Sequence, residues 1–269
     1  MAIVLLIAPA VLYLLALFVV PIGYVLLLGI TDPRLSLENY RRLFTVPLYA
    51  DVMLHTVKVS GIVTASCLLL GYPLAYVMAR RNDWLALVFL ITVGVSFWTG
   101  FVVRTYAWLI ILGNRGPVSA LYAFAGWGRP PQLLFTSFAS ALGMTHILLP
   151  YMVFALYGVM RRIDLSYLRA AASLGAGPLR AFRHVFLPLS LPGVVNGCVL
   201  VFTVCLGFYI TPILLGTPRD MMISQLINQQ IEDLLAWGFA SAIATVLLAM
   251  TLFLLALYHR FAGLDRLWG

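Results

Sequence analysis

Charged residues are scarce in this sequence, and acidic residues are scarcer than basic ones. Only 10% of the 269 residues are charged, with 9 Asp and Glu against 17 Lys and Arg, while 63% are hydrophobic. Soluble domains carry about 25% charged residues, so this composition excludes an ordinary water-soluble protein. Together with a mean hydropathy of +1.02, it indicates an integral membrane protein.

Lysine is almost absent, which bears on nucleotide binding. Lys58 is the only lysine, and it does not follow the glycine-rich turn that a phosphate-binding loop requires. We therefore predict no ATP site within this chain. The other basic residues are arginines, nearly all of which flank apolar runs. This pattern sets the orientation of a membrane protein, so we predict no nucleic-acid partner.

No Asp or Glu lies within any of the long apolar runs. Ion-driven carriers usually place a carboxylate or a histidine at membrane depth. A secondary carrier or channel subunit for a small amine or anion is therefore kept only as the alternative function. The four histidines lack metal-ligand spacing, and the runs contain neither a G-x-S-x-G motif nor paired carboxylates. We predict no catalytic residue, no metal site and no cofactor in this chain.

The three cysteines, Cys67, Cys198 and Cys205, all lie inside apolar runs. On a single helix Cys198 and Cys205 would be about 10 Å apart, which is too far for a disulfide bond. We expect buried free thiols.

Six apolar runs are each long enough to cross a bilayer as a helix, which takes about 20 residues. The first has no basic residue before it, which is untypical of a signal peptide, so we interpret it as a retained span. The ten-residue alternation of a membrane β-barrel does not occur. The sequence predicts an all-α integral membrane protein with a single transmembrane domain over residues 1–269. Its six transmembrane helices are expected at residues 3–30, 56–79, 85–112, 136–160, 189–215 and 239–259.

Arginines between the runs predict the orientation. Residues 161–185 carry five arginines against one aspartate, whereas residues 216–238 carry three carboxylates against one arginine. The side richer in arginine is cytoplasmic. Residues 161–185 and both termini are therefore expected inside, and residues 216–238 outside. In the fifth run, the small-residue pair Gly193 and Gly197 predicts close helix packing.

The longest basic segment is residues 168–188, LRAAASLGAGPLRAFRHVFLP. Its turn residues predict two short helices in succession. A left-handed Gly175 closes the first, and Pro178 opens the second, which Pro188 ends. A short amphipathic helix pair between membrane spans suits either the lipid interface or docking into another protein.

The same segment resembles the cytoplasmic loop of permease subunits of bacterial ATP-binding-cassette importers, which has the form E-A-A-x3-G-x9-I-x-L-P. Arg169 stands here where that family has glutamate, and Val185 stands where it has isoleucine. The resemblance implies that the loop at about 161–188 couples this chain to a separate ATPase subunit. The loop residues it assigns to coupling are Arg169, Ala170, Ala171, Gly175, Gly177, Pro178, Leu187 and Pro188.

The third apolar run ends in F-W-T-G-F-V-V-R-T-Y-A-W at residues 97–108, which resembles a stretch of the spermidine/putrescine-type permeases. Further matches to that subfamily lie at residues 30–32, 38–40, 211–216, 218–220 and 225–227. The resemblance implies a type I ATP-binding-cassette importer permease of the MetI-like fold in the bacterial inner membrane. It would move a small polyamine delivered by a periplasmic solute-binding protein. The other implied partners are a second homologous permease and two ATPase subunits, which would bind ATP and Mg²⁺.

A pathway for a polycation would offer aromatic faces along its length and carboxylates at its outer end. Aromatic faces attract ammonium groups by cation–π interaction. Residues 97–108 fit two alternatives equally well: such a pathway lining, or an aromatic belt at the membrane interface. We expect Arg104 to point toward lipid headgroups or an acidic partner. Residues 220–238 predict an interfacial helix or part of an outer gate. The candidate pathway residues are Trp98, Tyr106, Trp108, Tyr209, Asp220 and Glu232.

Overall fold

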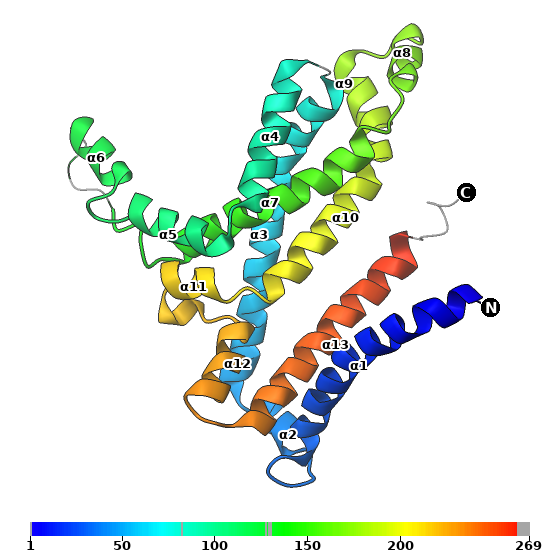
Figure 1. The fold of residues 1–269 in the computed structure, drawn as a ribbon. Coiled ribbons are helices and arrows are strands. Elements are labelled where there is room, and N and C mark those ends of the chain that lie inside the picture. The colour runs from blue at the N-terminus through cyan, green and yellow to red at the C-terminus, as the bar shows by residue number, and fades with distance from the viewer. Residues whose placement is uncertain (1, 82, 127, 129–130, 263–269) are drawn as a thin grey trace. The chain divides into compact units, whose positions relative to one another are not determined.

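The computed structural model describes residues 2–81, 83–126, 128 and 131–262 (Figure 1). These residues form helices joined by turns, with no strand among them, as the sequence predicts. The chain divides into two compact units, Met1–Leu54 with Ile223–Phe253 and His55–Met222 with Leu254–Gly269. We call them unit 1 and unit 2. The single domain expected from the sequence stays a prediction.

Unit 1 is built mainly from the two ends of the chain. Its helices are α1 (Ala2–Thr31), α2 (Glu38–Thr45), the beginning of α3 (Pro47–Arg80), α12 (Ile223–Glu232) and most of α13 (Trp237–Ala262). Gly29 allows α1 to approach α13 closely, since a Cβ atom there would lie 3.2 Å from the backbone nitrogen of Ala242. Near this contact the Asp32 carboxylate accepts a 2.8 Å hydrogen bond from the Gly238 amide.

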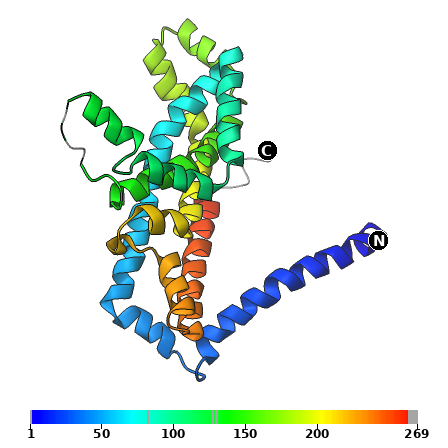
Figure 2. The same cartoon turned by 60° about the vertical axis from the view of Figure 1, so that its left-hand side comes forward.

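Unit 2 contains the rest of α3 and the middle of the chain. Its further helices are α4 (Trp84–Trp98), α5 (Phe101–Ile111), α6 (Pro117–Phe124), α7 (Ser137–Met160), α8 (Ser166–Ser173), α9 (Pro178–Ala181), the π-helix η1 (Phe182–Phe186), α10 (Leu187–Leu206), α11 (Ile210–Leu215) and the 3₁₀-helix η2 (Pro218–Asp220). Figures 1 and 2 show α5 and α6 turning away from the α3–α4 pair.

Helix α7 forms the centre of unit 2. Met144, Leu148, Met152 and Leu156 recur every four residues along it and are fully buried, which is the spacing of a buried helix face. Helix α10 packs closely on this face at its two small residues. A Cβ atom at Gly197 would lie 2.6 Å from the Met152 sulfur, and one at Gly193 would lie 3.0 Å from Val159. The predicted close packing is therefore confirmed.

Five described helices are long and apolar enough to cross a membrane, or six if a bent pair counts as one span. The third apolar run is a bent pair and not one continuous helix, since α4 and α5 meet at 99°. Thr99 and Gly100 between them have extended backbone, with ψ values of 125° and 138°. The fifth run is also broken, because α10 ends at Leu206 and a separate helix α11 follows.

Pro188 does not end the second short helix as predicted. Helix α9 continues through η1 into α10, with Pro188 inside the continuous helix. The reason lies in η1, where the Leu187 amide donates to the Phe182 carbonyl five residues earlier. This wider π turn accommodates a residue that has no N–H and would obstruct an ordinary α turn.

Candidate functional site

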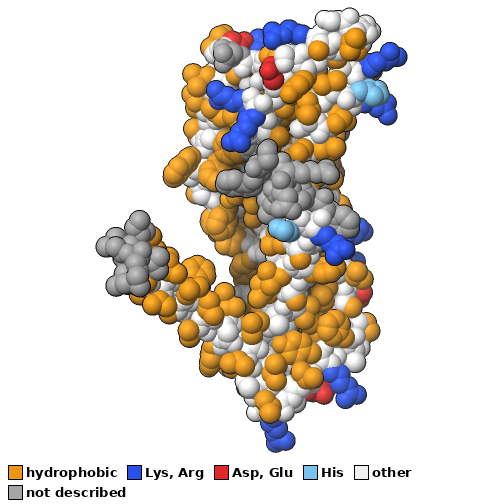
Figure 3. Space-filling view, turned by 90° about the vertical axis from the view of Figure 1, so that its right-hand side faces the viewer, with side chains coloured by type: hydrophobic (Ala, Val, Ile, Leu, Met, Phe, Trp, Pro, Cys, Tyr) orange, Lys and Arg blue, Asp and Glu red, His pale blue; other side chains and the backbone are white. Residues whose placement is uncertain are grey.

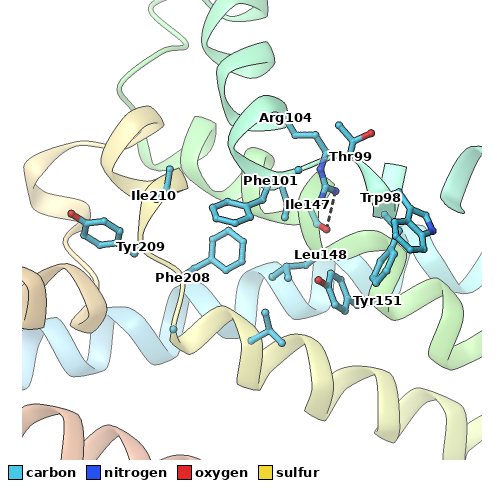
Figure 4. Close-up of a pocket in the computed structure, with 14 residues that line it drawn as sticks. Trp98, Thr99, Phe101, Arg104, Ile147, Leu148, Tyr151, Phe208, Tyr209 and Ile210 are labelled. Carbon is cyan, nitrogen blue, oxygen red and sulfur yellow. Dashed lines mark hydrogen bonds between the residues drawn. The ribbon is translucent and has the colours of Figure 1, made fainter. Parts of the chain in front are cut away.

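Both helix breaks of unit 2 open onto one pocket of about 550 Å³ (Figure 4). The α4–α5 bend supplies one wall, α7 supplies the floor, and the α10–α11 break supplies the opposite wall. Each break places a glycine in the lining, Gly100 at the first and Gly207 at the second. The lining residues are Phe97, Trp98, Thr99, Gly100, Phe101, Arg104, Ile147, Leu148, Tyr151, Val204, Gly207, Phe208, Tyr209 and Ile210.

Arg104 is the only charged residue of this lining. Its side chain is 7% exposed, and its Nη1 donates a 3.2 Å hydrogen bond to the Ile147 carbonyl oxygen (Figure 4). The expectation that Arg104 points toward lipid headgroups or an acidic partner is therefore wrong. The bend before α5 turns this helix toward α7, so that Arg104 enters the pocket wall. Its Nε atom is buried and has no hydrogen-bond partner among the described residues.

Aromatic side chains dominate the rest of the lining. Trp98 is 88% exposed at the end of α4, and Tyr209 lines the pocket from the α10–α11 break. The rings of Phe97 and Tyr151 are 5.1 Å apart between centroids, in an edge-to-face arrangement. Such an arrangement leaves ring faces available to an apolar or cationic group.

Two other predicted pathway residues, Tyr106 and Trp108, lie outside this lining. Trp108 is half-buried, and its indole N–H donates to His146 Nδ1 at 3.1 Å. It thereby joins α5 to α7, while Tyr106 is exposed on α5. Two buried hydroxyl groups, those of Thr105 and Thr211, lie 3.0 Å apart and join α5 to α11. These contacts fix the helices that follow the two breaks.

Asp220 lies in a separate buried cluster of unit 2, where its side chain is 8% exposed. One carboxylate oxygen accepts from the Thr217 amide at 2.9 Å and from the Thr217 hydroxyl at 2.7 Å. The other accepts from the Ser137 hydroxyl and lies 3.9 Å from His55 Nε2. Burial by itself raises the pKa of Asp220, but the hydrogen bonds from Ser137 and Thr217, with a smaller contribution from His55, hold this pKa below its ordinary value.

Glu232 is exposed at the end of α12 in unit 1, where it accepts a 2.8 Å hydrogen bond from Asn228. Helix α12 is the amphipathic helix predicted for this region, although it is shorter than residues 220–238. Asp220 and Glu232 thus lie on different elements in different units. Of the six predicted pathway residues, the structure brings Trp98 and Tyr209 together at one pocket.

The helix pair predicted for residues 168–188 is present as α8 and α9; its cytoplasmic location stays a prediction. Gly175 has a φ of +81°, and the Ala176 amide donates to the Ala171 carbonyl at 3.0 Å, which is the Schellman geometry that favours glycine. Gly177 has extended backbone, and Pro178 is the first residue of α9. The other residues assigned to coupling also lie here, with Arg169, Ala170 and Pro188 exposed and Ala171 and Leu187 half-buried.

Tyr151 and Phe208 are pocket residues that were not predicted from the sequence. Tyr151 follows Pro150 in the middle of an apolar run, and Phe208 follows Gly207. Gly207 marks the break after α10, and a glycine inside a predicted span can signal such a break. Pro150 marks none, because α7 continues through it, so the sequence carried no comparable signal for Tyr151.

The described part of the chain is thus an all-helical membrane transport domain, with two broken helices around a pocket and an exposed helix pair on one connecting segment. Residues 71–263 match the family described as binding-protein-dependent transport system inner membrane component. The chain belongs to this family, whose members are transport permeases rather than enzymes, and it is a permease subunit of an ATP-binding-cassette importer in the bacterial inner membrane.

Similar proteins agree with this family. The spermidine/putrescine transport system permease protein PotB of Salmonella typhimurium (strain SL1344) is 34% identical over 84% of this chain and 78% of its own length. PotB of Escherichia coli (strain K12) is 33% identical over 84% of this chain and 82% of its own. The crystal structure of a bacterial alginate ABC transporter, in complex with an alginate pentasaccharide-bound periplasmic protein, has the same fold. Its TM-score is 0.76 at 16% identity, covering 97% of this chain and 95% of that one.

Proposed function

We propose that this permease passes a small organic polycation of the spermidine or putrescine kind. The observation that carries the proposal is the aromatic lining of the pocket at the two helix breaks. The similarity to two PotB permeases over most of the chain supports the same substrate class. A desolvated cation–π contact contributes about 2 kcal/mol. Contacts with a few ring faces therefore offset part of the free energy that an ammonium group loses when it leaves water.

Arg104 supports a second candidate, which is an anionic substrate. It is buried in the pocket wall, has no carboxylate partner among the described residues, and keeps an unpaired Nε. A guanidinium group with a free N–H suits a carboxylate or an oxyanion. In the proposed pathway a polyamine would pass this charge with its ammonium groups on the ring faces of residues such as Trp98 and Tyr209, which also line the pocket.

The α8–α9 pair is proposed to couple the permease to its ATPase. Leu174 and Leu179 are 89% and 79% exposed on this pair, and exposed apolar side chains of this kind suit docking into another protein. In this proposal ATP and Mg²⁺ bind to two ATPase subunits. A second permease subunit completes the pathway, and a periplasmic binding protein delivers the substrate. Both termini face the cytoplasm, and the chain acts as one transmembrane domain.

The substrate proposal is tested with the complete importer in proteoliposomes. ATP hydrolysis and uptake are measured with the binding protein and, in turn, spermidine, putrescine, sulfate and phosphate. Stimulation by a polyamine alone is the expected result. Stimulation by an oxyanion alone would overturn the polycation proposal and favour the anionic candidate.

A further inference from the structure

A second pocket of unit 2, of about 700 Å³, lies beside the turn between α3 and α4. Three arginines line it: Arg80 at the end of α3, Arg81 in the turn, and Arg161 after α7. Asp83 is the only carboxylate among the described residues of the lining. The pocket shares no residue with the pocket around Arg104. No step of the proposed transport function uses it.

The charges of this pocket are not balanced by the protein. Asp83 is already paired, since its Oδ2 accepts from Arg81 Nη2 at 2.7 Å and from Arg81 Nε at 2.9 Å. Arg161 Nη1 donates to the neutral Tyr157 hydroxyl at 2.7 Å. Arg80 Nη1 is buried without a hydrogen-bond partner in the described residues. Two guanidinium groups therefore share the pocket without a carboxylate in the described part of the chain, which favours an anionic ligand.

Arg80 is also held in place. Its Cζ lies 5.9 Å from the ring centroids of both Tyr76 and Phe186. The two rings contact each other edge to face, 4.9 Å apart between centroids, and a guanidinium group that lies against both keeps its orientation, so less conformational entropy is lost when it binds an anion. This position distinguishes Arg80 from an arginine that merely flanks a span and extends into solvent.

Much of the remaining lining is apolar, and part of it lies along α4. Trp84 is 70% exposed and Leu87 is 56% exposed, and both line the pocket together with Leu90. The pocket lies where α3 ends and α4 begins, and tryptophan at the end of an apolar helix is typical of the headgroup level of a membrane. Figure 3 shows basic side chains at the end of unit 2 that carries α8 and the α3–α4 turn, with hydrophobic side chains along the flank.

We propose that this pocket binds the phosphate headgroup of an anionic phospholipid from the cytoplasmic leaflet. Arg80 and Arg161 would hold the phosphate, and the acyl chains would lie along Trp84, Leu87 and Leu90. Basic pockets between transmembrane helices on the cytoplasmic side are suited to such headgroups. The apolar part continues onto an exposed flank of α4, which fits a lipid better than a soluble anion or an acidic protein loop.

The test uses the complete importer purified in detergent. Native mass spectrometry counts bound phosphatidylglycerol, and thermal unfolding is followed with added phosphatidylglycerol, phosphatidylcholine or inorganic phosphate. We expect stabilisation by phosphatidylglycerol only. Each of Arg80→Gln and Arg161→Gln should weaken this binding about tenfold or more, since a hydrogen bond between charged groups is lost. Arg80→Lys should retain part of the binding because it keeps the charge.

Arg162→Gln is the matched control, because Arg162 is exposed next to Arg161 and does not line the pocket. It should bind phosphatidylglycerol like the wild type. Equal binding by wild type, Arg80→Gln and Arg161→Gln would overturn the proposal, and so would equal stabilisation by phosphatidylcholine. Stabilisation by inorganic phosphate alone would assign the site to a free anion. Loss of the ATPase subunit from the two variants, with lipid binding unchanged, would assign it to a protein contact.

Discussion

The Arg104 guanidinium group donates a 3.2 Å hydrogen bond to the carbonyl oxygen of Ile147. This contact joins α5, directly after the sharp bend, to the central helix α7. It also places a fixed positive charge in the wall of a pocket whose other lining is largely aromatic and aliphatic. In the proposed pathway, the substrate class depends on which is stronger: the attraction of a cation to the ring faces, or its repulsion by Arg104.

Trp98→Ala tests the ring faces. If a polyamine passes the pocket, losing a cation–π contact of about 2 kcal/mol should slow uptake roughly thirtyfold. Trp98→Phe should slow it less, and the affinity of the binding protein should not change. Uptake of labelled spermidine into proteoliposomes is the measurement. Phe124→Ala is the control, since Phe124 is fully exposed on α6, outside the pocket. Unchanged uptake by Trp98→Ala would contradict the aromatic pathway.

Arg104→Gln tests the charge in the same assay. The glutamine amide can still donate a hydrogen bond toward α7, so the change removes mainly the positive charge. For a polycation whose ammonium groups pass on the ring faces, uptake should change by only a few-fold. A sharp rise would mean that Arg104 repels the substrate within the pathway, while abolished uptake together with oxyanion stimulation of the wild type would favour the anionic candidate.

Gly175→Val should uncouple transport from ATP hydrolysis. A side chain at φ +81° is disfavoured by roughly 1–2 kcal/mol, and more for a β-branched residue. The turn between α8 and α9 should therefore change while the membrane spans stay intact. Substrate-stimulated ATPase activity in proteoliposomes is the readout. Gly158→Ala is the control, because Gly158 lies on α7 outside the coupling loop and a Cβ atom there would meet nothing within 4 Å. Full coupling in a well-expressed Gly175→Val complex would remove this turn from the proposed role.

The orientation predicts opposite labelling of two single cysteines. In a background where Cys67, Cys198 and Cys205 are replaced by alanine, Ser173→Cys should be cytoplasmic and Asp233→Cys periplasmic. Both positions are exposed. An impermeant maleimide added to spheroplasts should label only Asp233→Cys before lysis. Labelling of Ser173→Cys from outside would contradict the orientation and the coupling role of α8 and α9.

Asp220→Asn should destabilise the protein at neutral pH by about 1–3 kcal/mol, because an NH2 group replaces one carboxylate oxygen and the buried donors of either Thr217 or Ser137 lose their acceptor. The folded-state pKa of Asp220 lies below its unfolded value. The stabilisation is therefore fully present above the unfolded pKa and is lost as the pH falls through the folded pKa. Thermal unfolding from pH 8 down to pH 3 should show a constant gap between wild type and variant that closes at the acidic end. Asp233→Asn, at an exposed position, should show no gap.

The sequence by itself determined the class of this protein. Its apolar runs are longer and more hydrophobic than the helices of a soluble core. They must therefore lie in lipid, as helices that satisfy their own backbone hydrogen bonds. The turn at Gly175 was also predictable, because αL geometry and the following Gly177-Pro178 are local properties of the chain. Close packing at Gly193 and Gly197 followed from residue size alone.

Only the tertiary structure decided which residues form the pocket. The bend at Thr99 and Gly100 and the break after Leu206 depend on packing against α7, and hydropathy is the same for a straight run and a bent one. Arg104 was expected at the membrane interface but lies in the pocket wall. Trp108 and Asp220 have hydrogen-bond partners on α7, His146 and Ser137, which are far from them in the sequence. Buried polar groups must be paired wherever the fold places them.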